Sequence, residues 1–208
     1  MDDHPLVRVG LVGLVNAEPD MEICGDTGST VDALRLAETT EPDVVIVDLS
    51  LSDGNGLTLI KRLRSNNSAV KTLVCSMHDE SLFAQRALNA GARGYINKQE
   101  ATRHVVSAIR RVLDGKIYLS DRMTEQTLLN AARRGAGPMH RSVELLTDRE
   151  FEVFELIGQC KGTSEIAEKL HISVKTIETH REKIKRKLNL RSGAELTRRA
   201  IHWAINET

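Results

Sequence analysis

The sequence predicts an α/β domain with a doubly wound parallel sheet, followed by a smaller domain made only of helices. In the first part, short apolar runs at 43–48, 70–76 and 93–97 alternate with stretches of helical periodicity, which is typical of a parallel sheet. No strand is predicted after Tyr118, where only helical stretches follow. A chain of 208 residues that is 40% apolar is large enough for two such cores.

Composition narrows the class of protein. The chain carries 29 basic and 29 acidic residues, so its net charge gives no indication of nucleic-acid binding. A local excess of basic residues has to be looked for in each segment instead. Its three cysteines are odd in number and widely spaced, which fits neither a disulfide framework nor a zinc site. No apolar run is long enough to cross a membrane, and the N-terminus is acidic, unlike a signal peptide. We therefore expect a soluble, cytoplasmic protein.

Two of the predicted strands in the first part end in a polar residue. Run 43–48 (DVVIVD) ends in Asp48, and run 70–76 (VKTLVCS) ends in Ser76. In doubly wound sheets the chemistry collects at the carboxyl ends of the strands, so these residues are candidates for a common site. The helices of this part are predicted at 57–65, 81–91 and 102–113.

A segment rich in glycine, proline and arginine separates the two parts. Residues 120–134 are predicted to be helical and run into RRGAGPMHRS, a composition typical of a linker. We expect three regions: a first domain at 1–118, a linker with a helix at 119–145, and a second domain at 146–208.

The second domain opens with a helix-start signal. In LTDRE, Thr147 and Glu150 can cap the helix reciprocally. The inward face of this helix is predicted to be Val153, Phe154 and Ile157.

Two further helices complete the pattern of a helix-turn-helix. TSEIAEKL predicts a short helix capped by Thr163 or Ser164, and a tight turn at 171–173 leads to a second helix capped by Ser173. The buried stripe of that second helix is predicted to be Val174, Ile177, Ile184 and Leu188.

The exposed side of the second helix collects positive charge. Between residues 173 and 191 there are seven basic residues and two acidic ones, a local excess of five. Basic residues gathered in this way can contact the phosphates of a nucleic-acid backbone, and such contacts make nucleic-acid binding depend on the salt concentration. Basic surface helices are also common in proteins that bind no nucleic acid.

The stretches LTDREFEVFELI and KGTSEIAEKLHISVKTIETHREKIKRKL resemble the LuxR-type four-helix DNA-binding domain. The resemblance implies that the helix at 173–188 enters the major groove of double-stranded DNA. It also implies that a final helix, at about 192–204, forms a homodimer. Base contacts are implied for Glu178, Thr179 and Glu182, and phosphate contacts for Lys175, Thr176, Lys183 and Lys187.

The first part is similar to the receiver domain of NarL/FixJ response regulators, through DDHPLVR, EPDVVIVDLSLSDGNGL, TLVCSMHDE and ALNAGARGYINK. The resemblance implies that Asp48 takes a phosphoryl group from a histidine kinase. It also implies that Asp2, Asp3 and Asp48 hold Mg²⁺ together with a backbone carbonyl near Ser50.

The resemblance assigns three further residues to the same site. Lys98 would neutralise phosphoryl oxygens, Ser76 would hydrogen-bond the phosphoryl group, and Tyr95 would swing inward with it. A carboxylate nucleophile, a hard cation and an ammonium group are what phosphoryl transfer needs for charge neutralisation.

The start of the chain departs from the receiver pattern. In receivers an apolar strand of about five residues, central in the order 2-1-3-4-5, comes before the acid pair, whereas here only Met1 does. Losing five buried apolar side chains at roughly 1.5–3 kcal/mol each forfeits about 10 kcal/mol. A whole domain is stable by only about 5–15 kcal/mol, so the standard fold should fail or be badly compromised.

Three explanations of this departure are open. The true start can lie upstream of Met1. Alternatively VRVGLVGLV, which is rich in valine and carries Gly10 and Gly13, forms the strand instead of the first helix. In the third explanation the protein is a truncated regulator whose receiver forms dimers and accepts no phosphoryl group.

The leading hypothesis is that the protein is a dimeric, DNA-binding transcriptional regulator controlled by phosphorylation of Asp48. The alternatives are a DNA-binding regulator that does not depend on phosphorylation and a partner that sequesters intact regulators. An enzyme is not predicted. The chain lacks a second aspartate two residues after Asp48, an arginine six residues after Cys75, and a glycine-rich phosphate loop.

Overall fold

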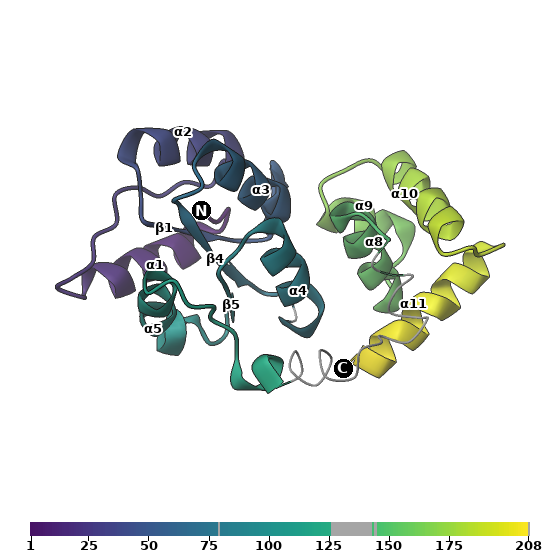
Figure 1. Cartoon of the computed structure of the whole chain (residues 1–208). Helices are drawn as coiled ribbons and strands as arrows, with labels where there is room; N and C mark the ends of the chain where they lie inside the picture. Colours follow the sequence, from purple (N-terminus) through teal and green to yellow (C-terminus); the bar gives the residue numbers. More distant parts are fainter. Residues whose placement is uncertain (79, 126–142, 144, 208) are drawn as a thin grey trace. The chain divides into compact units, whose positions relative to one another are not determined.

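A computed structural model describes residues 1–78, 80–125, 143 and 145–207 of the chain. The chain divides into two compact units, Met1–Gln126 and Thr127–Thr208 (Figure 1). Of the predicted linker helix, residues 121–125 are helical, and most of the remainder lies outside the described residues. The exact domain boundaries therefore stay a prediction.

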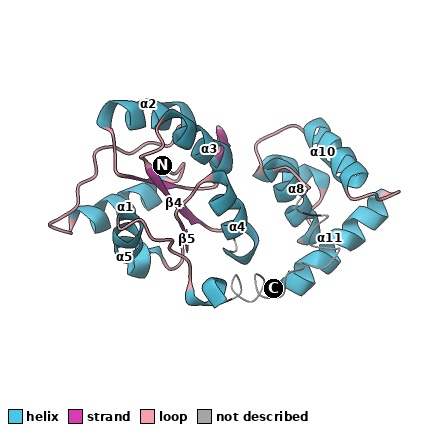
Figure 2. Cartoon of the chain, viewed as in Figure 1, coloured by secondary structure: helices cyan, strands magenta, loops and turns pink. Residues whose placement is uncertain are grey.

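The first unit is built around a parallel sheet of three strands in the order β1-β4-β5 (Figure 1), drawn in magenta in Figure 2. The register pairs Val45 with Thr72 and Leu73 with Gly94. The strands are β1 (Val44–Val47), β4 (Lys71–Ser76) and β5 (Gly94–Asn97), which confirms the three predicted runs. A separate antiparallel pair, β2 (Ser50–Leu51) and β3 (Gly54–Asn55), forms the turn after β1.

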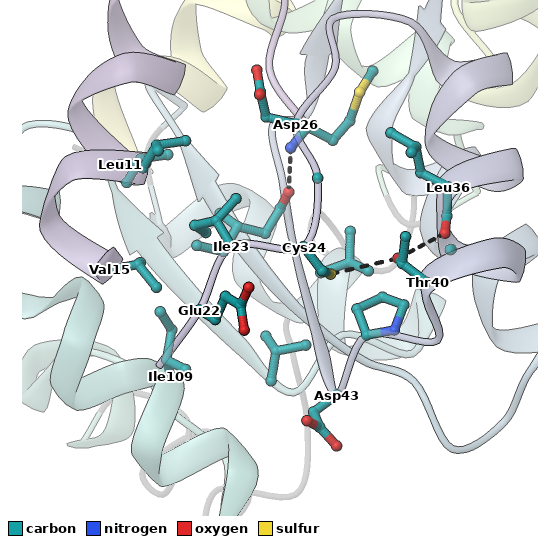
Figure 3. A pocket seen from close by; sticks show the side chains of 18 of the residues that line it. Leu11, Val15, Glu22, Ile23, Cys24, Asp26, Leu36, Thr40, Asp43 and Ile109 are labelled. Atoms are coloured by element: carbon teal, nitrogen blue, oxygen red, sulfur yellow. Dashed lines mark hydrogen bonds between the residues drawn. The ribbon is translucent and has the colours of Figure 1, made fainter. Parts of the chain in front are cut away.

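Helices cover both faces of this sheet (Figure 1). On one face, Val15 of α1 and Ile109 of α5 (both labelled in Figure 3) share an apolar cluster with Leu73 and Ile96 of the sheet. The two helices of this face are α1 (Pro5–Asn16) and α5 (Ala101–Leu113). The other helices of the unit are α2 (Thr30–Thr40), α3 (Gly56–Asn66) and α4 (Glu80–Ala90). The three helices predicted from periodicity are confirmed.

The valine-rich segment after the acid pair is the helix α1, so the explanation in which it becomes a strand is wrong. Pro5 stands at the first helical position, where its fixed φ favours a helix start. Leu11, Leu14 and Val15 share one face and pack on the apolar cluster under α5. Burial of this face outweighs the weak helix propensity of valine and glycine.

Within the described residues, β1 is an edge of the sheet, and only Met1 lies beside it as a neighbour in the ladder. The Met1 ammonium donates to the Ile46 carbonyl at 2.9 Å, and the Asp48 N–H donates to the Met1 carbonyl at 3.0 Å. Residues 21–27, which follow α1, have no regular secondary structure. The sheet therefore has three strands where the receiver resemblance implies five.

The second unit contains a four-helix arrangement around an aromatic core. The Trp203 ring lies edge-on to Phe151 at 5.2 Å between centroids and 5.7 Å from Phe154. The helices are α8 (Asp148–Gly158), α9 (Thr163–Lys169), α10 (Val174–Lys187) and α11 (Gly193–Glu207). Val153, Phe154 and Ile157 are buried, as predicted.

Local signals at the helix starts are confirmed for α8 and α10. The Thr147 side chain accepts from the Glu150 N–H while the Glu150 carboxylate accepts from the Thr147 N–H, which is a complete capping box. The Ser173 side chain accepts from the Thr176 N–H.

Two details of the predicted helix-turn-helix are wrong. The N-cap of α9 is Gly162, whose N–H donates to the Glu165 carboxylate at 2.7 Å, so neither Thr163 nor Ser164 caps this helix. Val174 is 43% exposed, because the first residue after the turn does not yet face the core. Ile177, Ile184 and Leu188 are buried, as predicted. No described helix is long and apolar enough to cross a membrane.

Candidate functional site

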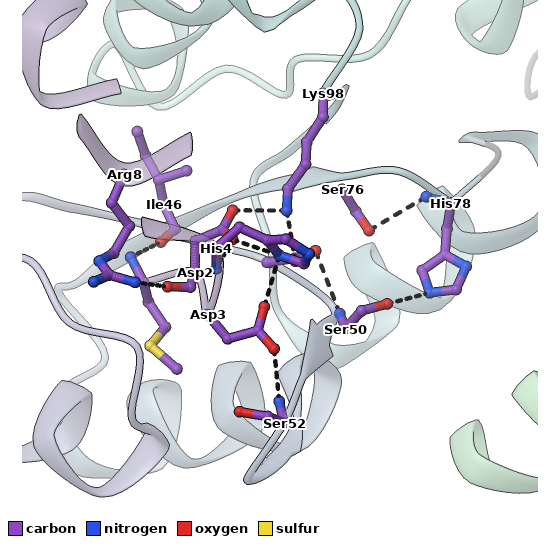
Figure 4. A network of polar contacts seen from close by, with 12 residues as sticks. Asp2, Asp3, His4, Arg8, Ile46, Ser50, Ser52, Ser76, His78 and Lys98 are labelled. Atoms are coloured by element: carbon purple, nitrogen blue, oxygen red, sulfur yellow. Dashed lines mark hydrogen bonds and ion pairs between the residues drawn. The ribbon is translucent and has the colours of Figure 1, made fainter. Parts of the chain in front are cut away.

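The carboxyl ends of the parallel strands bring three predicted site residues together (Figure 4). Asp48 directly follows β1, Ser76 ends β4, and Lys98 follows β5. The Lys98 N–H donates to the Ser76 carbonyl at 2.8 Å, which fixes the start of the Lys98 side chain at this edge. Asp48 is only 2% exposed, so its carboxylate is held in a low-dielectric setting.

One ammonium group joins two buried carboxylates at this edge. Lys98 Nζ lies 2.7 Å from Asp48 Oδ2 and 2.7 Å from Asp2 Oδ2. Burial disfavours the ammonium form, but the hydrogen bonds to Asp2 and Asp48 outweigh burial and raise the pKa of Lys98 above its ordinary value. The Lys98 ammonium therefore places a positive charge next to the Asp48 carboxylate.

Acidic side chains form a pocket beside this ion pair. Ligand atoms of Asp2, Asp3, His4 and Asp48 all lie within 4.8 Å of one another. Asp3 Oδ2 accepts from the Ser52 N–H at 3.0 Å. Asp3 Oδ1 is buried and accepts no hydrogen bond among the described residues, although His4 Nδ1 lies 2.8 Å away. Carboxylate oxygens in this arrangement suit a hard divalent cation.

The loop after β4 connects Ser76 and Tyr95. Tyr95 is fully buried, and its hydroxyl donates to the His78 carbonyl at 2.9 Å. The His78 N–H donates to Ser76 Oγ at 3.4 Å, and His78 Nε2 lies 2.8 Å from Ser50 Oγ. This loop therefore links the buried tyrosine to the rim of the Asp48 pocket.

His4 and His78 were not among the residues predicted for this site. The position of His4 directly after the acid pair was a signal that could have suggested its contact with Asp3. His78 had no such signal, because Ser50 lies 28 residues earlier and meets it only through the fold.

The outer face of α10 presents most of the residues predicted to contact DNA. Those that are exposed are Lys175, Thr176, Glu178, Thr179, Glu182 and Lys183. Lys187 differs, because its Nζ lies 2.6 Å from Glu150 Oε2 inside the same unit. Glu182 forms an ion pair with Lys185 at 2.8 Å, which partly neutralises the negative charge on this face.

Helix α11 carries a shallow groove on its exposed side. Ile205 there is 72% exposed, although it is large and apolar. The groove is lined by Ala194, Thr197, Arg198, Ile201, His202 and Ile205. Exposed apolar side chains that cluster in this way often mark an interaction surface.

Both units match known families. Residues 1–110 match the response regulator receiver domain, and residues 144–200 match the family described as bacterial regulatory proteins, luxR family. A receiver joined to a LuxR-type helix-turn-helix defines a class of DNA-binding transcriptional regulators, not of enzymes. The chain belongs to this family of response regulators.

Curated relatives cover nearly the whole chain. The oxygen regulatory protein NreC of Staphylococcus carnosus (strain TM300) is 35% identical over 204 residues, which are 96% of this chain and 94% of that protein. The oxygen regulatory protein NreC of Staphylococcus aureus (strain MRSA252) is 32% identical over 210 residues, with 99% and 97% of the two chains covered.

Solved structures share the fold. A two-component response regulator of the LuxR family from Aurantimonas sp. SI85-9A1 is 31% identical, with a TM-score of 0.59 over 63% of this chain and 94% of that one. RcsB from Salmonella enterica serovar Typhimurium, bound to promoter rprA in the presence of the phosphomimetic BeF3⁻, is similar with a TM-score of 0.62. The identity is 23%, and 96% of this chain and 95% of that one are covered.

Proposed function

We propose that Asp48 accepts a phosphoryl group from a sensor histidine kinase and that this modification controls DNA binding by the second unit. The observation that carries the proposal is the contact of Lys98 Nζ with Asp48 Oδ2 at 2.7 Å in a buried pocket. In the transfer, the P–N bond of the kinase phosphohistidine breaks and a P–O bond to the Asp48 carboxylate forms. The Lys98 ammonium then offsets negative charge on the phosphoryl oxygens.

The acidic pocket is proposed to hold Mg²⁺ through Asp2, Asp3, Asp48 and a backbone carbonyl near Ser50. When bound, the ion would neutralise phosphoryl charge during transfer. The closeness of the ligand atoms of Asp2, Asp3, His4 and Asp48, all within 4.8 Å of one another, supports this assignment. Ser76 is proposed to hydrogen-bond the phosphoryl group, and Tyr95 to follow its occupancy through the His78 loop.

The variant Asp48→Asn is expected to abolish phosphoryl incorporation, because the amide is not a nucleophile for phosphorus. Acetyl phosphate with Mg²⁺ serves as donor, and intact mass measures incorporation. The matched control is Asp53→Asn, which removes a carboxylate that bonds Thr30 instead of the pocket. Equal incorporation in Asp48→Asn and in the unchanged protein would contradict the assignment.

DNA binding is proposed to use the outer face of α10. Lys175, Thr176 and Lys183 would hold phosphates, while Glu178, Thr179 and Glu182 would face base edges and favour cytosine amino groups. Lys187 remains a proposed phosphate contact, although reaching DNA would require it to leave Glu150. Two copies of the chain would bind together through the groove on α11.

Replacing Lys175 and Lys183 together by glutamine is expected to weaken binding to all DNA sequences alike. Each lost phosphate contact should lower the slope of log affinity against log salt by about 1. Fluorescence anisotropy with a labelled duplex at several salt concentrations measures both quantities. Lys116→Gln in the first unit is the control, and a slope unchanged in the double variant would exclude α10 from the phosphate contacts.

A regulator that binds DNA without phosphorylation is the second candidate, and the three-stranded sheet favours it. DNA affinity that is the same with and without the phosphodonor would support it. A large increase with the donor would support control by Asp48. A third candidate sequesters intact regulators, and strong DNA binding by the purified chain alone would argue against it.

A further inference from the structure

Two apolar groups lie on the charged outer face of α10. Val174, the first residue of this helix, is 43% exposed although it is apolar. Thr179 is also exposed, and its Oγ1 donates to the Lys175 carbonyl at 3.0 Å. Because the hydroxyl hydrogen of Thr179 is bonded to the helix backbone, this side chain offers a methyl group and no donor to a molecule that contacts α10.

The acidic side chains of the same face differ in how they are paired. Lys185 Nζ lies 2.8 Å from the Glu182 carboxylate, so Glu182 already has a counter-charge. Glu178 is exposed and makes no ion pair within the part of the chain that the structure describes. Since Glu178 follows Val174 by one turn of the helix, the two side chains are neighbours on its surface.

The chemistry of base edges in the major groove limits what these groups can recognise. Thymine presents an apolar group there, its C5-methyl, which aliphatic side chains and the methyl group of threonine contact. Cytosine presents an amino donor, which a carboxylate accepts. A threonine whose hydroxyl hydrogen is free can donate to acceptors on guanine, adenine or thymine instead. The bond from Thr179 to the Lys175 carbonyl disfavours that alternative.

Resting on the proposed binding of DNA by α10, we propose that Val174 and Thr179 recognise thymine through its C5-methyl group. The N-terminal residues of a recognition helix contact base edges, and Val174 is the first residue of α10. Since one helical turn advances about 5.4 Å and base pairs are stacked about 3.4 Å apart, the preferred site places a thymine within about two base pairs of the cytosine that Glu178 contacts.

Uracil substitution in the DNA tests the proposal with the unchanged chain. Duplexes that bind the full chain are first selected from a randomised pool in the presence of acetyl phosphate and Mg²⁺. Each thymine of the selected site is then replaced by uracil, which lacks only the methyl group and keeps the hydrogen-bonding edge. Loss of a methyl contact is expected to weaken binding about three- to fivefold at the contacted thymines and not at the others. Fluorescence anisotropy at constant salt measures the affinities.

Variants that remove methyl groups assign each contact to a residue. Thr179→Ser keeps the hydroxyl and its bond to Lys175 but removes the methyl group. It should bind the thymine duplex about three- to fivefold more weakly and lose the sensitivity to uracil at one position. Val174→Ala should lose the sensitivity at a different position. Thr163→Ser, which removes the same methyl group from α9, is the control and should bind both duplexes as the unchanged chain does.

Two results would overturn the proposal. Every thymine of the selected site can tolerate uracil without loss of affinity, or both Thr179→Ser and Val174→Ala can keep the full sensitivity of the unchanged chain. A salt slope that is unchanged in the double variant of Lys175 and Lys183 would instead contradict the placement of α10 on DNA, and the thymine contacts with it. A changed slope combined with tolerance of uracil would leave DNA binding by α10 in place and reject only the contacts with thymine.

Discussion

Gly56→Ala is expected to be among the most destabilising single substitutions in this chain. A Cβ at position 56 would lie 2.6 Å from Leu49 Cα and against the backbone carbonyl of Asp48, and neither atom can move without shifting the end of β1. Overpacking of this kind costs about 3 kcal/mol. Since Asp48 itself would be displaced, phosphoryl incorporation should fall together with stability.

Urea unfolding, followed by circular dichroism, measures the loss of stability, and intact mass after treatment with acetyl phosphate measures incorporation. Gly10→Ala is the matched control, because a Cβ on Gly10 has no neighbour within 4 Å and position 10 is inside the helix α1. That control should gain about 0.5–1 kcal/mol, since alanine favours a helix over glycine. Equal stability of the two variants would show that the turn after β1 is not packed as described.

Lys98→Ala is expected to have the second large effect, and the effect should depend on Mg²⁺. Removing the ammonium leaves Asp2 and Asp48, each 2% exposed, as adjacent buried carboxylates without their counter-charge. Breaking a buried ion pair from one side costs about 3–5 kcal/mol. A divalent cation in the same pocket restores positive charge, so Mg²⁺ should recover more stability in this variant than in the unchanged chain.

Thermal unfolding in EDTA and in millimolar Mg²⁺ measures this difference. The control Lys116→Ala removes an exposed ion pair with Asp114, at 3.4 Å, and should change stability by less than about 0.5 kcal/mol in either condition. A Lys98→Ala variant as stable as the control in EDTA would mean that the two carboxylates are not held together as described. An equal effect of Mg²⁺ on all three proteins would argue against a cation in the pocket.

Two histidines, His4 and His78, contact the residues of the Asp48 pocket. His4 lies 2.8 Å from Asp3 Oδ1, so an imidazole nitrogen stands beside the oxygen atoms proposed to hold Mg²⁺. His78 connects Ser50 with Ser76 and with the hydroxyl of Tyr95. Hydrogen bonds through Ser50, Ser76 and His78 thus connect the surroundings of Asp48 with the loop before α4.

The alternation of apolar runs and helical stretches was enough to predict a parallel sheet in the first unit and the edge of the sheet at which the site lies. Alternating strands and helices define a parallel sheet, and in such a sheet the residues after β1, β4 and β5 must share one edge. Asp48, Ser76 and Lys98 could therefore be placed together without knowing any distance. The capping box of α8 and the Ser173 cap of α10 were equally predictable, because they depend on neighbours within a few residues, whereas the cap of α9 at Gly162 was not predicted.

Features that depend on contacts between distant segments of the chain could not be predicted from the sequence. The valine-rich α1 is helical because its Val15 face packs against α5, a contact between residues nearly a hundred positions apart. Lys187 lies beside Glu150 and not on an open basic face, because α10 packs on α8. Local propensity cannot specify such contacts, since their energy comes from burial and charge pairing between elements that meet only after folding.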